Sequence, residues 1–254
     1  MGIIDRFLLG ALLQVSAVTY YDLATRVSYM LFQLSTRFFL PVYPASAELH
    51  AKHDTPRLRS LFFKGMKVGV VMTLPVALAF ILWSKPLIQH WLGSGYDLTS
   101  ACLRVLAVNY AVWGLSVVPS AIMYGLNKPG VLVVEGVLRV ILNAILSFLF
   151  ISRMGMIGAA YGVTLATLIT ALSFLILKGK ILQISAVQLG REVFMIPALS
   201  IVTAIFLFHV RHFLKIPVIL LYGLFTAAFL YVSYVFYLGK ETTRHLLRSV
   251  LSVR

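Results

Sequence analysis

Apolar runs of about 20 residues recur along this chain of 254 residues, and short polar connections separate them. A run of that length is what an α-helix needs to cross the hydrocarbon core of a bilayer, which is about 30 Å thick. Seven runs are predicted to be full spans, and they begin near residues 20, 61, 98, 131, 155, 193 and 216. The pattern therefore predicts an all-α integral membrane protein, a polytopic helical bundle with no separate soluble domain.

The apolar segment that precedes the first span is shorter than the others. Residues 2–15 would extend only about 21 Å as a helix. We interpret this segment as the tail of a transmembrane helix whose front half is missing from the chain, and a re-entrant or interfacial segment is the alternative. Residues 181–192 are predicted to form an interfacial helix, and residues 239–254 a basic amphipathic tail on the membrane surface.

One face of the helix predicted between Tyr20 and Pro44 is polar and charged. At about 100° per residue, six side chains fall in one sector, namely Asp22, Arg26, Tyr29, Gln33, Arg37 and Pro44. A charge at the centre of a membrane helix costs roughly 2.5–3.5 kcal/mol, so this face is expected to line a protein interior or a watery cavity. Its surplus positive charge would attract anions, and guanidinium groups suit phosphate.

A second polar series lies in the span that begins near residue 131. Glu135, Arg139 and Asn143 follow one another at steps of four. Glu before Arg at that spacing is the favourable order for an intrahelical ion pair, so Glu135 and Arg139 are either a structural pair or part of a substrate site. Arg104 lies shallow enough in its span to reach the membrane surface.

Small residues and prolines predict how the spans pack and bend. Close approach of a neighbouring helix is expected at Gly155, Gly158, Ala159 and Gly162. Kinks are expected at Pro75 and near Pro119, and a helix break at residues 54–56.

Composition excludes several classes of function. The residues are 60% hydrophobic and 12% charged, and the single cysteine excludes an intrachain disulfide and a thiolate metal cluster. No catalytic carboxylate pair, nucleophile motif or metal-ligand spacing stands out, and His209 and His212 are more simply interfacial. We therefore expect no enzyme activity, no cofactor and no metal.

The net charge of +14 is explained by topology rather than by nucleic acid. Thirteen lysines and arginines fall in one set of alternate connections and four in the other. By the positive-inside rule, the first set is cytoplasmic, and the C-terminus with it.

The order of several segments resembles the polysaccharide flippases of the MOP superfamily, which include the Wzx-type O-antigen and lipid-linked oligosaccharide transporters. The resemblance extends to about residue 180 and is strongest in the proline-then-acidic loop and the G-x-x-G-A-A run. It is carried by IIDRFLLGALL, YYDLATRVSYML, FFLPVYPASAELHAKHDTPRLRSLFFKGM, LIQHWLGSGY, LRVLAVNYAVWGLSVVPSAIMYGLNKP and RMGMIGAAYGVTLATLI.

The resemblance implies two pseudo-symmetric lobes around a cavity that opens to alternate sides of the membrane. Residues 1–180 would be the second lobe, beginning with a truncated helix, residues 181–238 an extra transmembrane pair with the interfacial helix, and residues 239–254 a cytoplasmic tail. The substrate would be an undecaprenyl-diphosphate-linked oligosaccharide in a bacterial cytoplasmic (inner) membrane. The partners would be membrane lipid and either an N-terminal lobe or polysaccharide-assembly proteins, without nucleic acid.

The resemblance also implies roles for individual residues in this flippase. The diphosphate would be bound by Arg26 and Arg37, with a contribution from Arg139. Sugar hydroxyls would be bound by Gln33 and Asn143, and Glu135 and Asp22 would be structural or coupling acids.

Three alternatives remain open at this point. A multidrug exporter of the related MATE type would need membrane carboxylates, and Glu135 is the one suitable candidate. A membrane glycosyltransferase or polymerase subunit would need a sizeable loop with acids or histidines. The third alternative is a non-functional or purely structural membrane fragment.

Overall fold

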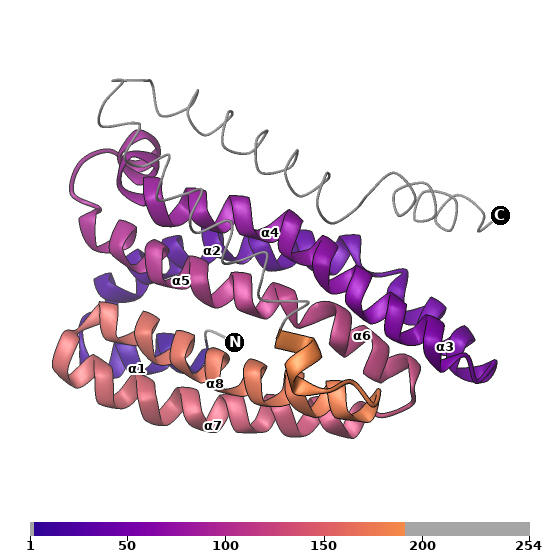
Figure 1. Cartoon of the computed structure of the whole chain (residues 1–254). Coiled ribbons are helices and arrows are strands. Elements are labelled where there is room, and N and C mark those ends of the chain that lie inside the picture. The colour runs from indigo at the N-terminus through magenta and orange to yellow at the C-terminus, as the bar shows by residue number, and fades with distance from the viewer. Residues whose placement is uncertain (1–2, 191–254) are drawn as a thin grey trace. The chain divides into compact units, whose positions relative to one another are not determined.

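The computed structural model describes residues 3–190, which form eight α-helices, a further helical run at residues 186–190 and no strand. They lie in the first of two compact units, Met1–Val193. The helices appear in Figure 1 and are α1 Ile3–Leu12, α2 Val15–Phe38, α3 Val42–Ala51, α4 Thr55–Leu92, α5 Asp97–Leu115, α6 Val117–Gly125, α7 Pro129–Met154 and α8 Met156–Ile181. The predicted all-α class is confirmed. The spans predicted near residues 193 and 216 and the basic tail lie outside the described residues.

Four of these helical stretches are long and apolar enough to cross a membrane. They are α4, α5 together with α6, α7 and α8, and they match the spans predicted near residues 61, 98, 131 and 155. Helix α2 has 24 residues, which is long enough, but it is not among the four. Its charged and hydroxyl side chains make it more polar than the others, so its passage through the membrane stays a prediction.

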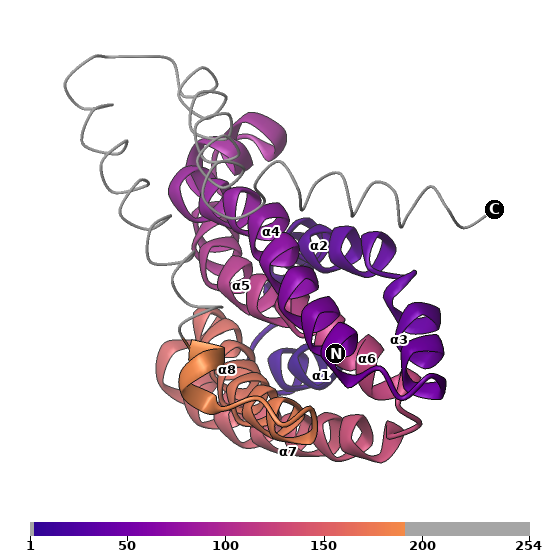
Figure 2. The same ribbon diagram turned by 45° about the vertical axis from the view of Figure 1, so that its right-hand side comes forward.

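Helix α5 lies at the centre of the packing. It contacts α2, α4 and α8, while α7 lies alongside α8 (Figures 1 and 2). Leu103 and Leu106 of α5 share one buried apolar cluster with Tyr21 and Leu31 of α2. This arrangement buries one side of α2 and leaves its other side without a neighbour in the described part of the chain.

The contact between α7 and α8 depends on glycine. A Cβ atom on Gly158 would lie 2.2 Å from the Phe150 carbonyl oxygen, and one on Gly162 would lie 2.4 Å from Ser147 Oγ. The close approach predicted at these two residues is therefore confirmed. Gly155 has a different role, because its positive φ of 62° turns the chain between the two helices and a Cβ there would meet nothing within 4 Å.

Helix breaks occur shortly before prolines, although not always before the prolines at which they were predicted. The departure from helical geometry inside α4 falls at Trp83 (φ −116°, ψ 17°), three residues before Pro86, and not at Pro75. A proline ring clashes with the carbonyl four residues earlier, which displaces the distortion toward the N-terminus. Pro119 conforms to this rule, since α5 gives way to α6 at Ser116. The predicted break at residues 54–56 is confirmed, because Asp54 caps α4 by accepting a hydrogen bond from the Arg57 backbone N–H.

Replacing Gly162 by Val is expected to destabilise the bundle, because the new side chain would overlap Ser147. Overpacking of this kind costs about 1–3 kcal/mol or more. Thermal unfolding of the purified protein in detergent would measure the loss. Gly130→Val is the matched control, since a Cβ at Gly130 meets nothing within 4 Å. Equal unfolding temperatures for the two variants would contradict the close approach.

Candidate functional site

Most of the predicted polar stripe lies on the side of α2 that the described helices leave exposed, while Asp22 contacts α1 and the Tyr29 ring contacts Tyr110 of α5. The buried positions of α2 are Tyr21, Ala24, Ser28, Leu31 and Ser35. The two serine hydroxyls are satisfied within the helix, since Ser28 Oγ donates to the Ala24 carbonyl at 2.8 Å and Ser35 Oγ to the Leu31 carbonyl at 3.2 Å. The exposed positions include four members of the stripe, which are Arg26, Tyr29, Gln33 and Arg37.

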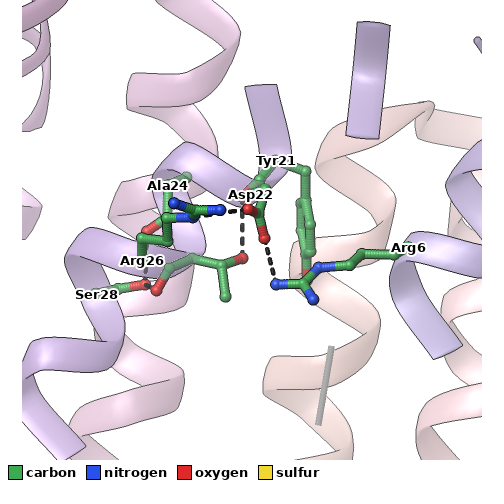
Figure 3. Close-up of polar contacts among 7 residues, drawn as sticks. Arg6, Tyr21, Asp22, Ala24, Arg26 and Ser28 are labelled. Carbon is green, nitrogen blue, oxygen red and sulfur yellow. Dashed lines mark hydrogen bonds and ion pairs between the residues drawn. The ribbon is translucent and has the colours of Figure 1, made fainter. Parts of the chain in front are cut away.

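Asp22 holds two arginines at one end of this stripe. Arg26 Nε donates to Asp22 Oδ2 at 2.8 Å, and Arg6 of α1 pairs with Oδ1 of the same carboxylate (Figure 3). Two guanidinium groups on one carboxylate leave a surplus of one positive charge. The spacing in the sequence placed Asp22 and Arg26 on one face of the helix. It missed Arg6, which is 16 residues from Asp22 and belongs to another helix.

A groove with a cavity volume of about 590 Å³ lies beside α2. Its walls come from α2, α3, α5, α6 and α7 and from the connections after α2 and α5, and the charged residues among those lining it are Glu135 and Arg139. The Arg139 guanidinium lies over the Trp113 ring at 4.7 Å from its centroid. Arg139 Nε is buried and has no hydrogen-bond partner.

Glu135 is paired with Lys178 of α8 and not with Arg139. Lys178 Nζ lies 2.6 Å from Glu135 Oε2 and also donates to Ser120 Oγ at 3.2 Å. The intrahelical pair with Arg139, one of the two roles that the spacing allowed, is therefore not the ion pair that Glu135 makes. A lysine that is only 1% exposed needs a carboxylate more than a partly exposed arginine does, because an unpaired buried charge is strongly destabilising. Sequence reasoning missed Lys178, since it stands at the end of an apolar run where a cytoplasmic lysine is ordinary.

Asn143 lies in the contact between α1 and α7. Its amide donates to Asp5 Oδ1 at 3.0 Å, and Ser147 Oγ donates to Asn143 Oδ1 at 2.9 Å and lies 3.2 Å from Asp5 Oδ1. Asp5 and Asn143 are 1% and 3% exposed. The structure does not bring Asn143 together with the groove residues, so its bond to a sugar hydroxyl stays a prediction. Asp5, which with Arg6 interrupts an apolar opening segment, is the feature of the sequence that could have indicated a buried partner.

The site as a whole fits binding of an anion better than covalent chemistry. Its charged residues are an arginine over an aromatic ring, a carboxylate already neutralised by a lysine, and a helix face with surplus arginine. Within residues 3–190, no three His, Cys, Asp or Glu side chains are grouped to hold a metal ion.

Comparisons with known proteins agree with the resemblance that the sequence motifs carry. The family described as "Polysaccharide biosynthesis protein" matches residues 1–101. The probable low-salt glycan biosynthesis flippase Agl15 of Haloferax volcanii is 25% identical over 170 residues, which are 67% of this chain and 34% of that protein. The predicted relationship to the polysaccharide flippases of the MOP superfamily is confirmed.

The fold is shared with a solved structure of a flippase. The inward closed conformation of the lipid II flippase MurJ superimposes with a TM-score of 0.59 at 16% identity, over 92% of this chain and 54% of MurJ. The chain thus spans about a third of the length of Agl15 and about half that of MurJ. It is a multi-pass membrane protein with part of a flippase fold.

If the exposed side of α2 faces water, a cysteine placed there will react with a charged, membrane-impermeant maleimide in intact membranes. Gln33→Cys is expected to be labelled, because a thiol needs water to ionise. Val137→Cys is the control, since Val137 is exposed on the apolar face of α7 and should contact lipid. The native Cys102 is buried and adds little background. Absence of labelling at position 33 would contradict a watery cavity.

Proposed function

We propose that this chain forms the second, C-terminal lobe of a flippase that moves a polyprenyl-diphosphate-linked oligosaccharide across the cytoplasmic membrane for surface glycan synthesis. The carrier lipid would be undecaprenyl diphosphate in a bacterial membrane. Transport would use alternating access, and arginines would bind the diphosphate. The names of Agl15 and MurJ, both flippases, support the class of transport.

The observation that carries the proposal is the position of the charged face of α2. Arg26, Gln33 and Arg37 lie on the side that the described helices leave exposed, next to a groove that holds Arg139. Charges on a lipid-facing surface would be costly, so this side is expected to meet a second lobe across water. The fraction of MurJ that the chain matches, 54%, fits one lobe of such a pair.

The chemistry of the face fits a diphosphate. Guanidinium groups present paired N–H donors that match phosphate oxygens, and charge-assisted bonds of this kind are about twice as strong as neutral ones. Arg37 would bind the anion without first leaving a carboxylate, whereas Arg26 shares Asp22 with Arg6. Gln33 lies between them on the same face and would bind sugar hydroxyls.

A MATE-type exporter of cations fits the same geometry less well. Glu135, the acid that would attract a cationic drug, is paired with a buried lysine. The net charge of the groove and of the α2 face is positive, which repels cations and attracts anions.

Loss of both exposed arginines is expected to stop transport. In cells whose surface glycan depends on the gene for this chain, Arg26→Ala with Arg37→Ala should lower the surface glycan by about tenfold or more, since two charge-assisted contacts are lost. The protein level in the membrane should stay the same, because both side chains are exposed.

Arg153→Ala is the matched control for this double variant. Arg153 is also an exposed arginine, but it lies in the last turn of α7, away from the groove-lining residues. It should leave the surface glycan unchanged. Normal surface glycan in the Arg26, Arg37 double variant would refute the proposed role of the arginines.

A further inference from the structure

A buried cation stands directly behind the wall of the groove. Lys178 reaches from α8 to two groove-lining residues, Glu135 at 2.6 Å and Ser120 at 3.2 Å. Lys178 itself does not line the groove and is 1% exposed. The ammonium group therefore acts on the groove through the two residues that it holds, Glu135 and Ser120, and of these Glu135 carries the charge.

Arg139 lies four residues after Glu135 on the same helix, which is the spacing and order at which these residue types normally pair. In the structure Arg139 lies over Trp113 instead, and its buried Nε has no acceptor. A buried N–H without an acceptor is costly, so the geometry leaves Arg139 ready for an acceptor that the described residues do not supply.

We propose that Lys178 is a positioning residue for anion binding in the groove. By pairing with Glu135, it keeps that carboxylate from Arg139 and leaves the guanidinium to the diphosphate of a lipid carrier. The inference rests on the proposed function, in which an anionic lipid enters this groove, and it adds a role for a lysine that does not itself touch the ligand.

The balance of charge gives the physical reason. In the native chain Glu135 and Lys178 neutralise each other, so Arg139 gives this part of the groove a net charge of +1. Without Lys178, Glu135 and Arg139 would neutralise each other and the net charge would be zero. A groove without net positive charge has lost its attraction for a diphosphate.

Binding of farnesyl diphosphate to the purified full chain in detergent, measured by isothermal titration calorimetry, tests this role. Farnesol, which lacks the charge, reports the contribution of the hydrocarbon alone. Lys178→Met should weaken binding of farnesyl diphosphate by about tenfold or more and leave binding of farnesol unchanged. Lys180→Met is the control, because Lys180 is an exposed lysine on the same helix.

Changes at Glu135 distinguish a positioning role from a merely structural one. Glu135→Gln removes the competitor of Arg139, so its affinity for farnesyl diphosphate should equal or exceed that of the native chain. A purely structural ion pair predicts the opposite, since Lys178 would be left buried and unpaired. The double variant Glu135→Gln with Lys178→Met should return to the native affinity, and Arg139→Met should lose it in every background.

Three results would overturn the inference. Native affinity in Lys178→Met would show that Glu135 does not compete for Arg139, and weakened binding in Glu135→Gln would show a structural pair. Should Lys178→Met fail to fold, Glu135→Gln and the double variant still decide the question. If the native chain binds farnesyl diphosphate no better than farnesol, the proposed function fails as well. If the native chain binds farnesyl diphosphate better than farnesol and the variants bind it with the same affinity, the role of Lys178 alone is overturned.

Discussion

The cost of placing a charge in hydrocarbon governs how this chain folds and what it can bind. Each charge within the membrane helices must find a partner, reach the surface or face water. Lys178 and Glu135 satisfy this requirement by pairing in the interior. The arginines of the predicted span α2 lie on a side that the described helices leave open, and of the two Arg26 also pairs with Asp22. The buried ion pair stabilises the bundle, whereas the arginines on the open side of α2 are accessible to a ligand.

The packing of the helices supports that division. Helix α5 contacts α2, α4 and α8, and the glycines of α8 bring it close to α7. Across the α7–α8 contact, Lys178 of α8 reaches Glu135, which lines the groove. The small residues of the α7–α8 contact and the charge of the groove are thus linked, since a wider separation of the two helices would lengthen the ion pair.

The sequence predicted those features that depend on local spacing. Periodicity placed the arginines of α2 on one face, and the spacing of Gly158 and Gly162 indicated a close helix contact. Contacts between distant segments were missed for a physical reason. Asp5 and Asn143 are 138 residues apart, and no helical spacing relates them.

At Glu135, packing between helices overrides the local rule for pairing of Glu and Arg within one helix. Its spacing from Arg139 favours an intrahelical pair, worth about 0.2–0.5 kcal/mol on an isolated helix. Leaving the buried Lys178 unpaired would cost far more free energy, because an uncompensated buried charge costs several kcal/mol. The stronger requirement decides the partner. Trp83 gives a similar lesson, since the break in α4 is explained by Pro86, whereas the sequence analysis predicted a kink at Pro75.

The central claim is that the charged face of α2 borders water within the membrane. Spin labels placed one at a time at residues 24, 26, 28, 31, 33, 35 and 37 of the full chain in lipid vesicles would test it most directly. Collision of each label with a water-soluble nickel chelate is compared with its collision with oxygen, which concentrates in lipid. We expect the nickel chelate to dominate at residues 26, 33 and 37 and both reagents to be excluded at residues 24, 28, 31 and 35. Dominant oxygen collision at residues 26, 33 and 37 would contradict the account.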